Sequence, residues 1–363
     1  MPEGPGAVRR ISGKRGLQQQ KDSDAGAERP FDEPLFVSCI IAFGMAAGLL
    51  VPGLADMLEP AILPSLFVIV VASLVPFRSI VSTALMKLQG RVTVVVLWLQ
   101  VALPIFVFSL ARVIDVPDAI LPFVLLSACS GAVFASPALA DLFGLDRNQA
   151  ALIMILSTML MPVSLCVFVG PLIGLDSLYA FEVFGLRVII FLVLPLLLVL
   201  VIRVVENALR GRRKPVPAGD GGDEGGVEVQ TPAETFAALL DRLSTRVGML
   251  ALAVFAAGIM KGVAVGIATD PGMMLALFAG ALVVNVGMMI TTRLALNPLG
   301  ADIAHTASII AMTRNVGLAY AMTSLFFGPT LLQYVALCQV PLLIGPVILR
   351  LRWATKTNAV QRA

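Results

Sequence analysis

The chain contains ten apolar runs, and each is long enough to cross a membrane as a helix. The hydrocarbon core of a bilayer is about 30 Å thick, which roughly 20 helical residues cross. Only 13% of the residues are charged and 58% are hydrophobic, whereas about 25% are charged in a soluble domain. The sequence therefore predicts an all-α, polytopic membrane protein, with spans near 34–54, 59–77, 91–113, 119–143, 148–174, 181–205, 243–266, 271–295, 303–327 and 330–352.

The basic residues indicate how these spans are oriented. With the N-terminus in the cytoplasm, 22 of the 26 Lys and Arg residues fall on the cytoplasmic side, as the positive-inside rule requires. The opposite loops keep Arg112 and Lys261 among several carboxylates. We therefore expect a multi-pass protein of a cell inner membrane, with both termini cytoplasmic and the lipid bilayer as a partner. A net charge of +3 is too small to indicate binding to nucleic acid.

Three polar segments interrupt or flank the spans. Residues 1–33 predict a disordered cytoplasmic tail, 206–235 a flexible cytoplasmic linker and 353–363 a second cytoplasmic tail, because they are rich in charge, Gly or Pro. Between them, we expect a first five-helix repeat over 34–174 and a second over 181–352. Because five is odd, consecutive repeats of this size insert with opposite orientations.

Arg314 lies in the middle of the ninth apolar run. Thr313, Asn315 and Gly317 surround it, so the centre of this span is polar and a poor helix former. A cation at this depth costs roughly 2.5–3.5 kcal/mol on insertion scales and usually faces a bundle interior or a watery cavity. Arg314 therefore marks a candidate binding site.

The fourth apolar run is interrupted as well, by Pro, Ser and Gly residues: Pro122, Ser127, Ser130, Gly131, Ser136 and Pro137. An interior proline removes a helical hydrogen bond, so we expect a broken helix around 131–137. Interrupted helices at matching positions of two halves point to a transporter binding site. The alternative is that small residues here only allow close helix packing.

Two short motifs in these spans resemble a known family. Arg314-Asn315-Val316-Gly317-Leu318 is similar to the Gln-Asn-x-Gly-Leu stretch of the bile acid:sodium symporter superfamily, and Cys129 to Phe134 is similar to the Cys-Thr-x-x-Val-Phe stretch of its arsenite efflux permeases. The resemblance covers nearly all ten spans. It implies two inverted five-helix repeats, a panel domain against a core domain, broken helices 4 and 9 that cross near the midplane, and transport by alternating access.

The sequence also departs from this family. Ile310 stands where sodium-coupled members carry a Glu, Arg314 replaces their Gln, and Ala135 and Ser136 replace their Ser-Asn pair. These changes remove the oxygen ligands of sodium, so we do not expect ordinary sodium coupling; proton coupling and facilitated flux are open. With His305 as the single histidine, we expect no metal site and no other cofactor.

Several roles are open for Arg314. Its guanidinium can bind an anionic substrate, because its fork geometry suits carboxylate and phosphate. It can instead stand in for a bound cation and hold the crossing helices together. A purely structural role, through an ion pair with Asp141 or hydrogen bonds to backbone carbonyls, is the third alternative, since buried charges need partners.

The other candidate substrate-binding residues lie in the interruptions or in the third span: Gln100, Cys129, Ser130, Ser136, Thr313 and Asn315. Serine in a membrane helix often bonds to its own turn, and an asparagine beside a break often caps a helix. Cys129 can bind a soft ion as a thiolate or be an inert packing residue. Arg187, near the start of the sixth span, is expected to extend to the membrane interface.

These features favour a secondary transporter of a small organic anion. An arsenite-type metalloid efflux permease is an alternative, as is a non-transporting membrane sensor or scaffold that keeps the fold, or a channel. An enzyme is not expected, because the sequence shows no nucleotide loop, no Ser/His/Asp arrangement and no cluster of metal ligands. The sequence gives no indication of the oligomeric state.

Overall fold

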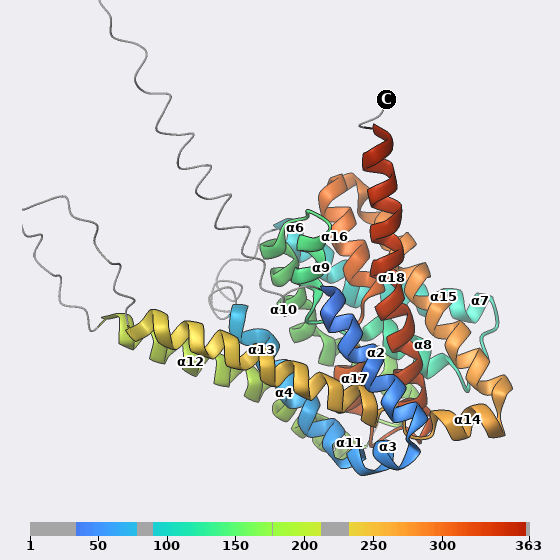
Figure 1. Cartoon of the computed structure of the whole chain (residues 1–363). Helices are drawn as coiled ribbons and strands as arrows, with labels where there is room; N and C mark the ends of the chain where they lie inside the picture. Colours follow the sequence, from blue (N-terminus) through green and yellow to red (C-terminus); the bar gives the residue numbers. More distant parts are fainter. Residues whose placement is uncertain (1–33, 78–89, 176, 212–231, 361–363) are drawn as a thin grey trace, which may run out of the picture.

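The computed structural model describes residues 34–77, 90–175, 177–211 and 232–360. These residues form helices and no sheet (Figure 1). The predicted tail at 1–33 lies outside the described residues, as does most of the predicted linker.

Helix covers each of the ten predicted apolar runs. The helices of the first half are α2 (Pro34–Leu50), α3 (Pro52–Leu58), α4 (Ile62–Leu74), α6 (Gly90–Leu97), α7 (Leu103–Val113), α8 (Leu121–Cys129), α9 (Ser136–Leu142) and α10 (Arg147–Ser164). Those of the second half are α11 (Leu178–Val188), α12 (Leu194–Gly211), α13 (Pro232–Gly258), α14 (Val263–Thr269), α15 (Pro271–Leu296), α16 (Ala301–Met312), α17 (Val316–Thr323) and α18 (Thr330–Val360). Short 3₁₀ or π turns connect α3 to α4, α6 to α7 and α11 to α12.

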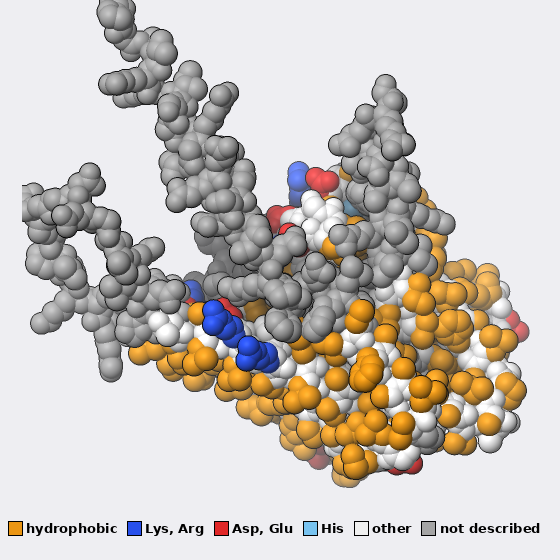
Figure 2. Space-filling model, viewed as in Figure 1, with side chains coloured by type: hydrophobic (Ala, Val, Ile, Leu, Met, Phe, Trp, Pro, Cys, Tyr) orange, Lys and Arg blue, Asp and Glu red, His pale blue; other side chains and the backbone are white. Residues whose placement is uncertain are grey.

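The described residues include six helices that are long and apolar enough to cross a membrane: Gly53–Phe77, Gly90–Val113, Arg147–Leu172, Leu178–Leu209, Thr235–Thr269 and Pro271–Leu299. Figure 2 shows hydrophobic side chains over most of the visible surface of this part of the molecule. Large exposed apolar side chains such as Leu50, Tyr179 and Leu250 would be costly in water. The chain is therefore a helical, membrane-embedded protein.

Small residues bring α2 and α13 into close contact. Gly44 and Gly48 lie one turn apart on α2 and face Ala253 and Ala257 on α13. A Cβ added at Gly44 would lie 2.9 Å from the carbonyl oxygen of Ala253, so only glycine permits this approach. The arrangement is the small-xxx-small packing that is common between membrane helices.

The helices form two packed groups. Helices α2, α4, α12 and α13 pack on one another. Helices α6 to α10 and α15 to α18 pack together in the second group, with α15 against α16 and α18. The interrupted pairs α8/α9 and α16/α17 belong to the second group, where α17 also contacts α4 and α11. The predicted interruptions of the fourth and ninth spans are thus both present, and the ninth lies where the two groups meet.

Two of the predicted polar segments are partly helical. Helix α12 continues to Gly211 and α13 begins at Pro232, so both ends of the predicted 206–235 linker are helical. Within α12, Glu206 is buried and pairs with Arg203 at 3.4 Å, which supports the helix where it continues beyond the predicted span 181–205. Helix α18 likewise continues to Val360, so residues 353–360 of the predicted cytoplasmic tail are helical.

Candidate functional site

The two helix interruptions meet as a short antiparallel bridge. Helix α8 ends at Cys129 and α9 begins at Ser136, while three residues separate α16 from α17. The backbone N–H of Val133 donates to the carbonyl of Thr313 at 3.1 Å, and the N–H of Asn315 donates to the carbonyl of Gly131 at 2.8 Å. These two hydrogen bonds satisfy backbone groups that the broken helices leave free, as the interior of a membrane requires.

Gly131 allows the crossing to sit directly on α10. A Cβ at this position would lie 3.0 Å from Thr158 Oγ1 and 3.1 Å from Thr158 Cα, which is tighter than an alanine tolerates without movement. One residue later, the N–H of Ala132 donates to Ser157 Oγ at 3.2 Å. Helix α10 therefore fixes the position of the extended segment between α8 and α9.

The guanidinium of Arg314 is buried at this crossing. Arg314 is 2% exposed. Its Nη1 donates to the carbonyl oxygen of Ser130 at 2.8 Å, and its Nη2 donates to that of Leu99 at 2.8 Å. Gln100 Nε2 donates to the same Ser130 oxygen at 3.1 Å. Within the described part of the chain, no carboxylate pairs with Arg314, and its Nε has no hydrogen-bond partner.

Both acceptor carbonyls are free for a structural reason. Ser130 has an extended backbone and follows the last residue of α8, so its carbonyl has no helical donor. Leu99 lies in a π turn, in which the N–H of Leu103 bonds to the carbonyl of Trp98 five residues earlier. The residue five positions after Leu99 is Pro104, which has no N–H. Arg314 therefore takes an oxygen that the proline leaves without a backbone partner.

The neighbouring carbonyl is freed in the same way. A regular helix would pair the carbonyl of Gln100 with the N–H four residues later, but that residue is also Pro104. The hydroxyl of Ser164, at the end of α10, donates to this oxygen instead. The Oε1 of Gln100 has no partner within the described residues. Side-chain donors from Arg314, Gln100 and Ser164 thus bind three backbone carbonyls that the proline and the end of α8 leave free.

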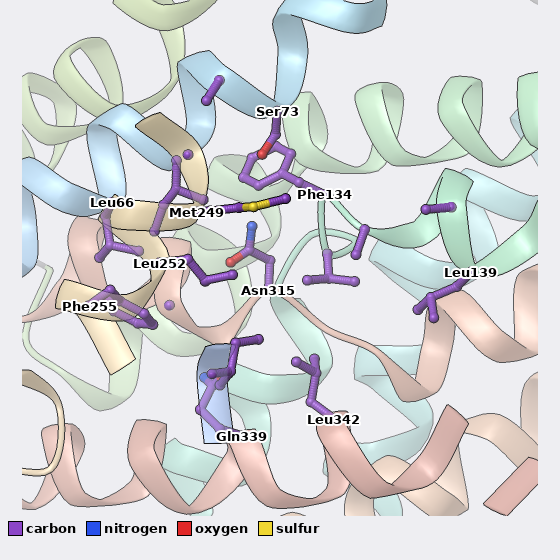
Figure 3. A pocket seen from close by; sticks show the side chains of 18 of the residues that line it. Leu66, Ser73, Phe134, Leu139, Met249, Leu252, Phe255, Asn315, Gln339 and Leu342 are labelled. Atoms are coloured by element: carbon purple, nitrogen blue, oxygen red, sulfur yellow. The ribbon is translucent and has the colours of Figure 1, made fainter. Parts of the chain in front are cut away.

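A cavity of about 330 Å³ lies beside the crossing. Its wall comes from α2, α4, α13 and α18 and from both interruptions, and most of the lining is aliphatic or aromatic. Figure 3 shows the side chain of Asn315 among the lining residues, with Met249 and Leu252 of α13 and Gln339 and Leu342 of α18 around it. Its volume falls at the lower end of the range of ligand pockets, about 300–1,000 Å³.

Polar groups in the cavity wall are few. Five neutral polar side chains contribute to it: Ser73, Ser244, Thr245, Asn315 and Gln339. Asn315 Oδ1 accepts from the N–H of Leu318 at 3.1 Å and so caps α17, while its Nδ2 has no partner among the described residues and remains a free donor. Arg314 is the one charged residue that the lining includes. A ligand here would meet apolar walls, a free amide donor and a nearby positive charge.

The predicted site residues divide into two groups. Arg314 and Asn315 belong to the cavity wall. The others lie within the crossing, away from the lining: Gln100, Cys129, Ser130, Ser136 and Thr313. The hydroxyls of Ser130, Ser136 and Thr313 each donate to a backbone carbonyl of their own turn. For the two serines, this is the alternative to lining the cavity. Cys129 is fully buried.

Two of the buried or half-buried arginines bind backbone carbonyls. Asp141 is exposed, so it does not pair with Arg314; the backbone-carbonyl alternative describes the actual contacts. Arg187 reaches the end of α17, and its extension to the membrane interface stays a prediction. Its Nη1 donates to the carbonyl of Ala321 at 2.6 Å and to Ser324 Oγ at 2.7 Å, because the carbonyls at the end of α17 lack helical donors.

Sequence reasoning missed most of the cavity wall. Leu66, Ser73, Met249 and Phe255 come from α4 and α13, whose sequences show ordinary apolar runs. Gly317 is the local sequence signal of this wall. A glycine there permits a close approach of Phe255, because a Cβ at position 317 would lie 3.1 Å from its ring. Among the described residues, no group of three or more His, Cys, Asp or Glu side chains is placed to hold a metal ion.

Comparison of the chain with protein-family models gives no match, and comparison with curated proteins gives none either. The functional argument therefore rests on the geometry of the crossing and the cavity. That geometry defines a class: a membrane-embedded helical protein in which two interrupted helices meet beside a mainly apolar cavity.

Proposed function

We propose that the protein is a secondary transporter that moves a small organic anion by alternating access. In this proposal ten helices form two inverted five-helix repeats, as in the bile acid:sodium symporter superfamily that the sequence resembles. The protein lies in a cell inner membrane with both termini in the cytoplasm. The observation that supports it most is the meeting of two interrupted helices at a buried Arg314, directly beside a cavity. Such interruptions mark the binding sites of transporters.

Arg314 takes the place of a mobile coupling cation in this mechanism. Its guanidinium binds two backbone carbonyl oxygens at the crossing, from Ser130 and Leu99, and such oxygens are the groups that a hard cation prefers. A tethered cation satisfies them permanently, so the two interrupted helices are held together without sodium. The proposed transporter therefore works without the usual sodium sites.

The same charge selects the substrate. Arg314 has no carboxylate partner within the described residues, and an uncompensated charge in a low-dielectric interior attracts an opposite charge strongly. The cavity walls offer apolar surface and the free amide donor of Asn315. A monoanion with an apolar body matches all three features, because its acidic group meets the positive field while its body replaces water against Leu66, Leu252 and Phe255.

Two measurements on one protein test the proposal. Thermal unfolding of the purified protein is followed across a panel of organic monoanions that differ in the size of their apolar body. An anion at 100 times its Kd should stabilise the protein by about 2.7 kcal/mol. That anion is then used for uptake into proteoliposomes, with sodium chloride or choline chloride as the salt. We expect the same uptake in both salts.

The matched variants are Arg314→Gln and Arg246→Gln. Arg246 is an exposed arginine on the face of α13 away from the crossing, so its loss should leave uptake unchanged, whereas loss of Arg314 should reduce it at least tenfold. The proposal fails if no anion on the panel stabilises the protein, or if uptake survives in Arg314→Gln that folds and extracts normally.

A further inference from the structure

Arg187 is a cation in an apolar helix, and its side chain contacts the end of a second helix. It lies near the end of α11, within the long apolar helix Leu178–Leu209, and its neighbours Leu186 and Ile189 are 57% and 54% exposed. Its side chain is half-buried and reaches α17, where a single nitrogen, Nη1, contacts both Ala321 O and Ser324 Oγ. A charge at such a position is costly unless a specific partner compensates for it.

The Arg187 contact and the cavity lie at different ends of α17. The helix has eight residues, which is too short to be stable by itself. Its first residues, with the capping Asn315 and Gly317, line the cavity. Its last carbonyls carry the partial negative charge of a helix C-terminus, and there Arg187 binds. Each end of one short helix therefore has a separate partner.

The cavity and the Arg187 contact lie on opposite sides of the crossing. From Phe255, beside Gly317, the cavity wall runs along α13 toward Ser244, in the first half of that helix. The chain after α17 runs the other way, into the start of α18, where Gln333 Nε2 donates to the carbonyl of Gly262 at 3.1 Å, beyond the C-terminal end of α13. On this second side, α17 lies between the cavity, at its first residues, and Arg187, at its last.

We propose that Arg187 is the latch that holds α17 in this position, and that α17, held there, closes the second side of the cavity. The latch is a positioning residue: it acts through α17 and does not touch the cavity. Release of the contact frees the C-terminal end of α17 and opens the second side. This role rests on the proposed transport function, although the structural step, exposure of the α17 end to water, can be measured without any substrate.

A cysteine reporter on α17 tests the latch directly. Tyr320 is half-buried and lies one turn before Ser324, so Tyr320→Cys reports water access at that end of the helix. The reaction of this cysteine with a membrane-impermeant maleimide is followed by site-resolved mass spectrometry. Adding Arg187→Gln should speed the labelling roughly tenfold, because a charged hydrogen bond is lost. Arg187→Lys should keep the slow rate, since one nitrogen makes both contacts.

Native cysteines provide the controls in the same molecule. Cys129 and Cys338 are buried, so their labelling should stay slow in each variant, and Arg246→Gln on the surface of α13 should leave all rates unchanged. An equal rate at position 320 with and without Arg187 would overturn the latch. A parallel increase at Cys129 would overturn it as well, because Arg187 would then only stabilise the fold. Either result leaves the uptake test of Arg314 unaffected, so the two proposals fail separately.

Discussion

Nη2 of Arg314 lies 2.8 Å from the carbonyl oxygen of Leu99, which is 215 residues earlier in the chain. The contact joins the ninth apolar span to a π turn in the third. It exists because Pro104 leaves that carbonyl without a backbone donor. The other hydrogen bond of the guanidinium goes to the carbonyl of Ser130. The buried charge is therefore held by neutral backbone dipoles rather than by a carboxylate among the described residues.

Replacement of Arg314 by alanine should make the stability of the protein depend on sodium. The substitution leaves the carbonyl of Leu99 without its donor and takes one of two donors from the carbonyl of Ser130. Both oxygens contacted the same cationic group, and such oxygens suit a small hard cation. In choline chloride we expect a loss of about 1–3 kcal/mol, from the unsatisfied carbonyl. Sodium chloride of equal ionic strength should restore part of it. Thermal unfolding in the two salts measures the effect.

The parent protein is the control for this salt comparison. With its tethered cation in place, it should unfold at the same temperature in sodium chloride and choline chloride. A variant that is equally unstable in both salts would show that the oxygens do not form a cation site, and it would remove the argument that Arg314 replaces one.

Pro104→Ala should weaken the dependence of the fold on Arg314. Alanine restores one backbone N–H, which can bond to the carbonyl of Leu99 or to that of Gln100. The carbonyl that it binds then needs no side-chain donor. In a double-mutant cycle, Arg314→Ala should therefore cost less in the Pro104→Ala background, with a coupling of at least about 0.5 kcal/mol. Pro271, in the first turn of α15, is the control, because its replacement should be additive with that of Arg314.

The sequence predicted the interruptions but not what supports them. Prolines, serines and glycines near Gly131, and Arg314 itself, are local signals, because they break helical hydrogen bonds or cannot be left in lipid. The pairing of Arg314 with Leu99 is not local. It depends on a proline five residues away in a span that otherwise resembles its neighbours, and only the packed structure brings that turn to the crossing.

The cavity wall and the orientation of Arg187 were hidden for a related reason. An apolar run gives the same pattern whether a residue such as Phe255 faces lipid, another helix or a cavity, because all three environments favour hydrophobic side chains. Arg187 lies near the start of a span, where extension to the interface is the usual outcome. Its actual partner is the end of α17, and the sequence does not show that this helix ends there.

Gly317→Ala should destabilise the protein, although alanine is the better helix former. The added methyl group would lie 3.1 Å from the Phe255 ring and 3.3 Å from Leu66, and such overpacking costs roughly 1–3 kcal/mol. Gly287, in the interior of α15, meets nothing within 4 Å, so the same change there should stabilise the protein by about 0.4–1 kcal/mol. Opposite shifts in thermal unfolding are expected, and two shifts of the same sign would contradict the close packing at Gly317.

Asn315→Asp separates the two roles of this side chain. The carboxylate keeps an oxygen for the N–H of Leu318 and adds a negative charge at the N-terminus of α17, where it is favourable by about 0.3–1 kcal/mol. It also removes the free Nδ2 donor and partly neutralises Arg314. The fold should therefore be as stable as the parent or slightly more stable, while the anion that stabilises the parent best should bind at least tenfold more weakly.

Asn315→Ala provides the opposite comparison: loss of the cap lowers stability by about 0.5–2 kcal/mol, but the positive charge of Arg314 is untouched, so anion binding should fall less than in the aspartate variant. If the aspartate variant bound the anion as tightly as the parent, the acidic group of the ligand would lie away from the crossing, and the field of Arg314 would not be what selects it.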